Sequence, residues 1–119
     1  MRYQDLLAYK KSFEVAMFIY NTSKSFPKEE TYSLTDQIRR SSRSVAVNIA
    51  EATRKRRYEK HFISKLTDSD SENSETQSWL EFALACEYIK KDEFNFLTEK
   101  SMEVGKLLNY MMNNPDKFL

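Results

Sequence analysis

Residues Thr67–Ser78 read TDSDSENSETQS, and this stretch decides the number of helices in the fold because it contains no apolar residue. Its serines and acids are typical of a solvated linker. However, Ser69, Asn73 and Thr76 fall at helical spacing, in line with the apolar residues on either side. The stretch also lacks glycine and proline, so we predict one continuous helix over residues 59–90. A three-helix fold with a disordered centre is the alternative.

The rest of the chain also favours an all-α fold. Among its 119 residues there are 1 glycine and 2 prolines, whereas the turns and bulges of a sandwich or barrel need many glycines. Apolar residues recur at steps of three and four on both sides of the polar stretch. The expected architecture is an antiparallel up-down-up-down four-helix bundle in a single domain spanning residues 1–119. Its helices are expected over residues 5–24, 34–54, 59–90 and 92–112.

The composition also argues against several classes of function. The longest purely apolar stretch, Val15–Tyr20, is too short to cross a bilayer. The first residues lack the apolar centre of a signal peptide, so we expect a cytoplasmic protein with no membrane partner. The chain has one cysteine, Cys86, and one histidine, His61, and it has no glycine-rich loop. The usual metal, nucleophile and phosphate-loop sites are therefore incomplete. We therefore expect no enzyme activity, catalytic residue, metal, cofactor or small-molecule substrate, and Cys86 is expected to fill the core.

The net charge of +1 hides two oppositely charged segments. Residues 39–65 carry nine basic and two acidic side chains, whereas residues 68–103 carry ten acidic side chains and three lysines. The positive charge is densest at the corner between the second and third helices, which could contact nucleic-acid phosphates while a tyrosine stacks on a base. The candidate nucleic-acid contacts are Arg54, Lys55, Arg56, Arg57, Tyr58 and Lys60. Alternatively, the opposed charges pair within the bundle or between subunits, or the basic run is a solvated turn.

A second polar group is expected inside the bundle, and we predict that it fixes the register of the helices. Carboxylate-bridged di-iron bundles need two Glu-x-x-His pairs, which this sequence cannot supply because its one histidine is in Glu-Lys-His. A buried carboxylate needs a cation and hydrogen bonds. We therefore predict that one of three nearby arginines pairs with Glu72 or Glu75. The candidate members of this network are Arg39, Arg40, Arg43, Asn48, Glu51, Glu72 and Glu75.

Apolar residues exceed what one core face per helix requires, which indicates a subunit interface. A second apolar stripe at the end of the third helix contains Trp79, Phe82, Cys86 and Ile89. Further candidates for exposed apolar side chains are Phe18, Phe96, Met112 and Phe118. Gly105, inside the last predicted helix, either marks the close approach of another helix or is simply tolerated there. We therefore expect a homo-oligomer.

Residues Phe26–Arg57 read FPKEETYSLTDQIRRSSRSVAVNIAEATRKRR and resemble the signature of the four-helix bundle proteins encoded in intervening sequences of bacterial 23S ribosomal RNA genes. The resemblance covers nearly the whole chain and rests on four motifs. These are the Phe-Pro turn, the run Leu-Thr-Asp-Gln-Ile-Arg-Arg, Asn-Ile-Ala-Glu and the later Glu-Thr-Gln-x-Trp-Leu. The resemblance implies the long third helix and a homo-oligomer, often a pentamer, of largely unassigned function. Departures are Ala52, where glycine is usual, and Asp68 and Asp70, where small apolar residues are usual.

The accessory proteins of diversity-generating retroelements are distantly similar to this family, and they bind nucleic acid and a reverse transcriptase. The resemblance therefore also implies RNA or DNA as a possible partner. Our leading interpretation is a non-enzymatic, homo-oligomeric four-helix bundle that acts as a binding or scaffolding module. The alternative is an RNA- or DNA-binding accessory protein that uses the basic corner Arg54–Lys60.

Overall fold

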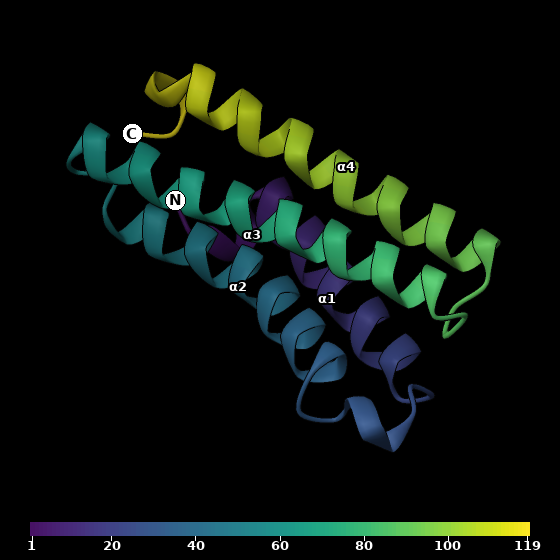
Figure 1. The fold of residues 1–119 in the computed structure, drawn as a ribbon. Helices are drawn as coiled ribbons and strands as arrows, with labels where there is room; N and C mark the ends of the chain where they lie inside the picture. The colour runs from purple at the N-terminus through teal and green to yellow at the C-terminus, as the bar shows by residue number, and fades with distance from the viewer.

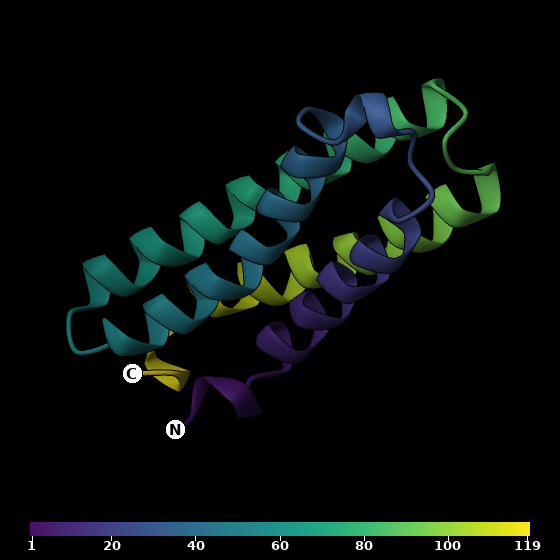
Figure 2. The same cartoon turned by 90° about the horizontal axis from the view of Figure 1, so that it is seen from below.

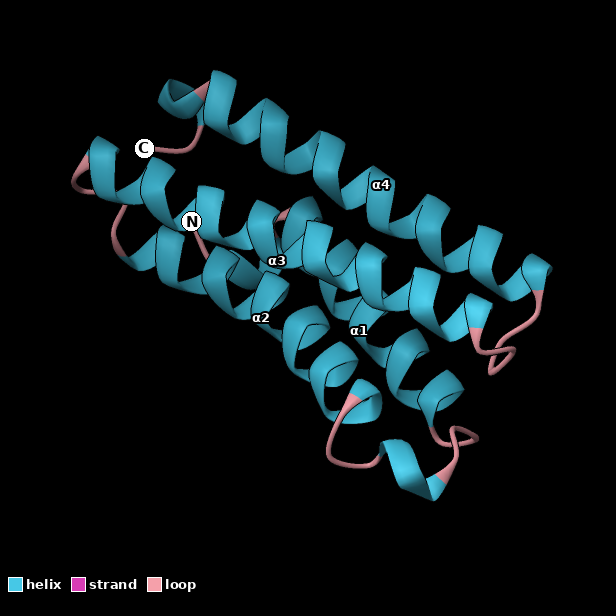
Figure 3. Ribbon diagram, in the orientation of Figure 1, coloured by secondary structure: helices cyan, strands magenta, loops and turns pink.

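Four α-helices make up the computed structural model, which describes residues 1–119 (Figure 1). Short loops join the helices and no strand is present (Figure 3). Consecutive helices pack against each other and the first also packs against the last, so the up-down four-helix bundle is confirmed. The helices are α1 (Leu7–Ser23), α2 (Leu34–Arg54), α3 (Glu59–Ala85) and α4 (Lys91–Asn113). Three 3-10 turns accompany them, η1 (Tyr3–Asp5), η2 (Lys28–Glu30) and η3 (Pro115–Lys117).

The two ends of the bundle carry different connections. Both termini lie at the end where α2 turns into α3, and the α1–α2 loop lies at the other end, with the α3–α4 turn (Figures 1 and 2). At the end with the termini, Nη1 of Arg56 donates a hydrogen bond to the carbonyl oxygen of Met1 at 2.9 Å. The fold therefore places the N-terminal segment beside the basic corner.

The polar stretch Thr67–Ser78 is helical throughout, because its inward-facing residues form a hydrogen-bonded layer in the core. Oγ of Ser69 donates to the carbonyl oxygen of Val45 in α2 at 2.8 Å. Nδ2 of Asn73 donates to the carbonyl oxygen of Ser101 in α4 at 2.9 Å, and Oγ of Ser101 donates back to Oδ1 of Asn73 at 2.9 Å. Buried polar groups with such partners cost little free energy. The linker interpretation is therefore excluded.

Apolar side chains fill the core on both sides of this polar layer. Along α3, Phe62 and Leu66 precede the layer, Leu80 and Ala83 follow it, and all four are buried. The other helices contribute fully buried side chains at helical spacing, among them Ile19, Ile38, Ile49, Leu97, Val104 and Leu108. Each helix thus buries one stripe, as its sequence pattern predicts. None of the helices combines the length and apolar character that a membrane span requires.

Helix α1 begins two residues later than predicted. Residues Tyr3–Asp5 form a separate 3-10 turn, and Leu6 after it has an extended backbone with φ −70° and ψ 131°. The side chain of Leu6 is buried in the core. Leu6 must leave the helical conformation to bury its side chain, and the 3-10 turn is therefore separate from α1. The sequence pattern alone did not indicate this break.

Helix α3 ends at Ala85 rather than at the predicted Lys90. Glu87 adopts a left-handed backbone with φ 61°, and the following amide of Tyr88 donates to the carbonyl oxygen of Ala83 at 2.9 Å. This is a Schellman ending. Because the helix stops here, Ile89 turns into the core instead of extending an exposed stripe, and Cys86 is exposed instead of filling the core.

Gly105 of α4 faces α3, but the contact between the two helices does not require a glycine. A Cβ atom at this position would lie 3.5 Å from Nδ2 of Asn73, which is ordinary van der Waals contact. The two helices therefore leave room for a methyl group, and the structure favours the interpretation that this glycine is simply tolerated.

Candidate functional site

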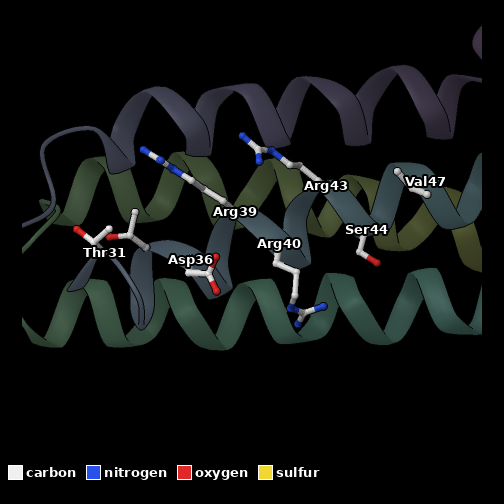
Figure 4. A pocket seen from close by; sticks show the side chains of 8 residues that line it. Thr31, Asp36, Arg39, Arg40, Arg43, Ser44 and Val47 are labelled. Atoms are coloured by element: carbon white, nitrogen blue, oxygen red, sulfur yellow. The ribbon is translucent and has the colours of Figure 1, made fainter. Parts of the chain in front are cut away.

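A furrow runs along the outer side of α2 and consists of three adjoining hollows. The first, of about 540 Å³, lies over the first half of α2 and extends to Val47 (Figure 4). Val47 also lines the second hollow, of about 280 Å³, together with Tyr3, Tyr9 and Arg54. Tyr3 and Arg54 in turn line the third, of about 470 Å³, at the corner between α2 and α3. Because neighbouring hollows share lining residues, we treat the three together and call them the arginine furrow.

All seven arginines of the chain line the arginine furrow, and none of its lysines does. The furrow also contains two carboxylates, those of Asp36 and Glu51. Unlike lysine, arginine binds phosphate and carboxylate groups through two parallel hydrogen bonds and stacks on aromatic rings. The separation of the two residue types therefore points to planar, oriented recognition of anions rather than to general positive charge. The arginines are Arg2, Arg39, Arg40, Arg43, Arg54, Arg56 and Arg57.

Arg39 and Arg43 are held against α1 at one wall of the furrow. Their guanidinium carbons lie 4.9 and 5.7 Å from the ring centre of Tyr20. Nε of Arg39 also donates to Oγ of Ser23 at 2.8 Å. Figure 4 shows both side chains pointing toward α1, whereas Arg40 points the other way, over α3. Neither Arg39 nor Arg43 pairs with a carboxylate, so their charges are fixed in position without being neutralised.

Arg40 makes the arginine–carboxylate contact that the sequence indicated. Its Nη1 lies 3.0 Å from Oε2 of Glu72, and its Nη2 donates to Glu75. The prediction that this contact lies inside the bundle is wrong, because the side chains of Arg40, Glu72 and Glu75 are 44%, 23% and 37% exposed. The small polar residues of α3 occupy the core-facing positions, so the longer acids beside them lie at the edge of the helix contact.

The remaining members of the predicted network form a separate group. Nζ of Lys65 lies 2.7 Å from Oε2 of Glu51 and donates to Oδ1 of Asn48 at 3.4 Å. The hydrogen bond to Glu51 raises the pKa of Lys65 above its ordinary value. The predicted single network is therefore wrong. Successive residues of α2 point to different neighbours, and its members fall into one group at α1 and two separate groups at α3.

The predicted basic corner is divided by the structure. Its three arginines line the third hollow of the furrow, whereas Lys55, Tyr58 and Lys60 are exposed outside it. The ring of Tyr58 instead lies 5.7 Å from that of His61. Sequence reasoning missed Arg2 and the tyrosines of the N-terminal segment. No local signal marked them, since they approach α2 only through the tertiary fold.

The first hollow also contains a buried hydroxyl group without a partner. Thr35 is 8% exposed, lines this hollow beside Arg39, and its Oγ1 makes no hydrogen bond within the protein. An unsatisfied buried polar group costs about 1–3 kcal/mol.

Apolar side chains exposed outside the furrow only partly match the predicted set. Phe82 of α3 is 58% exposed and lies 5.8 Å from the half-buried Trp79, measured between ring centres. Phe96 of α4 is also exposed, and Phe18 packs edge-on against it. Two expected residues, Met112 and Phe118, instead pack against the core. No three histidine, cysteine or acidic side chains come together in a way that could hold a metal ion.

The fold and the site define an all-α, up-down four-helix bundle with one arginine-lined face. The model of the 23S rRNA-intervening sequence protein family matches residues 4–110, and the chain belongs to this family. The chain is similar to a crystal structure of a protein of unknown function from the S23 ribosomal protein family of Bacteroides thetaiotaomicron VPI-5482. The two share 30% sequence identity with a TM-score of 0.81, over 90% of this chain and 96% of that chain. No curated protein matches the chain.

Proposed function

We propose that this protein is a non-enzymatic, self-assembling binding module that holds RNA or DNA by its phosphates in the arginine furrow. The observation that carries this proposal is the collection of every arginine, and no lysine, in one furrow. The exposed, unpaired thiol of Cys86 supports a reducing, cytoplasmic place of action.

The length of the furrow favours a polyanion over a single small anion. From Arg39 to Arg54 the helix rises by about 22 Å. Six of the seven arginines have no carboxylate within ion-pair distance, Arg40 being the exception. A row of charges of this length, most of them unpaired, suits a chain of phosphates, whose bound counterions are released when arginines replace them.

Salt dependence tests this proposal. We expect a labelled single-stranded RNA to bind in low salt, with an affinity that falls steeply as salt is added. Replacing Arg54 or Arg57 by glutamine should weaken binding and lower the slope of log affinity against log salt by about 0.7 per arginine. Lys106→Gln removes one positive charge outside the furrow, on the exposed side of α4, and should leave the slope unchanged.

Two results would contradict the proposal. The first is the absence of binding to RNA and DNA in low salt by folded protein, as judged by circular dichroism. The second is an equal loss of slope in the lysine control, because the furrow would then be no different from the remaining basic surface.

Self-assembly is the second part of the proposal, and the exposed end of α3 supports it. Phe82 projects from the surface beside Trp79, and acids of α3 flank both aromatic residues. An aromatic patch rimmed by charge is a common interface type. We propose that a second copy covers this patch and that repetition closes a ring, with a pentamer as the expected size.

Light scattering at micromolar concentration measures the assembled mass. The wild-type protein should be an oligomer, and Phe82→Glu should dissociate it because a charge would be buried in the interface. Phe96→Glu introduces the same charge on α4 and should leave the mass unchanged. A wild-type monomer, or equal dissociation by both variants, would rule out this interface.

A further inference from the structure

A row of aromatic side chains on η1 and α1 borders the second hollow of the arginine furrow. The rings of Tyr3 and Tyr9 lie 4.9 Å apart, and those of Tyr9 and Phe13 lie 6.0 Å apart. Tyr20 lies farther along the same face, since steps of four and seven residues return to one side of a helix. Tyr3 and Tyr9 line the second hollow together with Arg54, and Phe13 is 51% exposed. Aromatic rings thus lie beside Arg54 in the second hollow, and Phe13 and Tyr20 extend the row along α1 without lining any of the three hollows.

Two arginines of α2 are held in place by α1 rather than free. Arg39 and Arg43 are held over Tyr20, whose ring faces them from α1. Asp36, one turn before Arg39, also lines the first hollow and has no cation within 4.0 Å. It would repel a phosphate, so the positive row begins at Arg39. The row continues toward Arg57 past a second carboxylate, that of Glu51, whose Oε2 lies 2.7 Å from Nζ of Lys65. Because Arg39 and Arg43 cover the ring of Tyr20, the rings left for a ligand are those of Tyr3, Tyr9 and Phe13.

We infer that the arginine furrow takes a single strand of RNA or DNA, with its phosphates on the arginines of α2 and its bases stacked on the aromatic row of α1. This inference rests on the proposed function and specifies the form of the ligand. A single strand presents phosphates along one edge and unstacked bases along the other, which matches a furrow where Arg54 lies beside the rings of Tyr3 and Tyr9. In a duplex the base faces are stacked inside and cannot reach aromatic side chains. An acidic protein segment would match the arginines but would leave the aromatic row unexplained.

Equilibrium binding of labelled oligonucleotides tests this inference. The two ligands are a single strand of about 12 nucleotides and a hairpin whose duplex arm contains that sequence. The single strand should bind about tenfold more tightly than the duplex or better. Phe13→Ala should weaken single-strand binding about 5- to 150-fold, the range found when a stacking aromatic residue is removed. It should leave the salt slope unchanged, whereas Arg43→Gln should lower the slope by about 0.7.

Phe96→Ala is the matched control, because Phe96 is 42% exposed but lies on α4 outside the furrow. It should bind the single strand like the wild type. Phe13→Leu keeps apolar bulk on α1 and removes only the ring, so it should show the same weakening if Phe13→Ala does not fold.

Four outcomes would overturn the inference. If the duplex binds as tightly as the single strand, or if the Phe13 and Phe96 variants behave alike, the ligand is not a stacked single strand, although the proposed function stands. If no nucleic acid binds, both fail. If polyglutamate displaces the strand with equal affinity, the furrow is a site for acidic protein.

Discussion

Glu87 ends α3 in a backbone conformation that costs free energy for any residue with a side chain. Its φ of 61° lies in the left-handed region, which costs an L-residue about 1–2 kcal/mol. The two Schellman hydrogen bonds, from Glu87 to Leu84 and from Tyr88 to Ala83, satisfy carbonyl groups that the helix end would otherwise leave free. The ending is therefore imposed by hydrogen bonding and packing against the preference of the residue itself.

Glu87→Gly should stabilise the protein by about 1 kcal/mol, because glycine adopts positive φ without a clash of Cβ. Urea denaturation measures the free energy of unfolding. Glu81→Gly is the matched control, since Glu81 is exposed within α3 and glycine there should destabilise by about 1 kcal/mol. If both substitutions destabilise the protein equally, the left-handed ending contributes no strain.

At the scale of the elements, one hydrogen bond ties together the two connections at the same end of the bundle. The hydroxyl of Tyr88, in the α3–α4 turn, donates to Oε2 of Glu30 in η2 at 2.7 Å. This bond raises the pKa of Tyr88 to about 12. Hydrogen bonds from Ser33 and Tyr88 lower the pKa of Glu30. Folding therefore favours a neutral tyrosine and a charged glutamate.

The pH dependence of stability follows from these directions. The contribution of Tyr88 is complete below the ordinary tyrosine pKa of 10.0 and is lost as the pH rises toward about 12. The contribution of Glu30 is present above its ordinary value of 4.5 and is lost as the pH falls through its lowered pKa. Tyr88→Phe should therefore lower the melting temperature by a constant amount between about pH 6 and 9, and by less above pH 10.

Melting followed by circular dichroism across this pH range provides the check. Tyr32→Phe is the matched control, because Tyr32 is 94% exposed, and it should change the melting temperature at no pH. A deficit for Tyr88→Phe that stays constant up to about pH 12 would show that the Glu30 bond does not control the titration.

At the scale of the whole molecule, helix number and the core stripes could be predicted from sequence, because burial of one face imposes a local repeat on each helix. The polar layer of α3 followed the same repeat, so its helical state was also predictable. The ends of α1 and α3 were not, because they depend on the burial of Leu6 and Ile89 and on a left-handed residue. Where a helix ends depends on packing against distant segments, and the spacing of residues within one helix carries no information about those contacts.

The candidate site was less predictable than the fold. The excess of positive charge in residues 39–65 was visible in the sequence. The segregation of arginine from lysine was not, because it depends on which way each residue of α2 points. Arg40 turns to α3, whereas Arg39 and Arg43 turn to α1, although all three lie within about one helical turn.

The polar stretch Thr67–Ser78 shows which features follow from the sequence and which require the tertiary structure. The sequence by itself determined that this stretch is helical and that Ser69, Asn73 and Thr76 face inward, because a helical repeat is a local property. Only the tertiary structure decided what those residues bond to, and only it brought the N-terminal tyrosines and Arg2 beside the corner of α2. Contacts between distant segments depend on how helices pack in three dimensions, and no spacing along one chain encodes that directly.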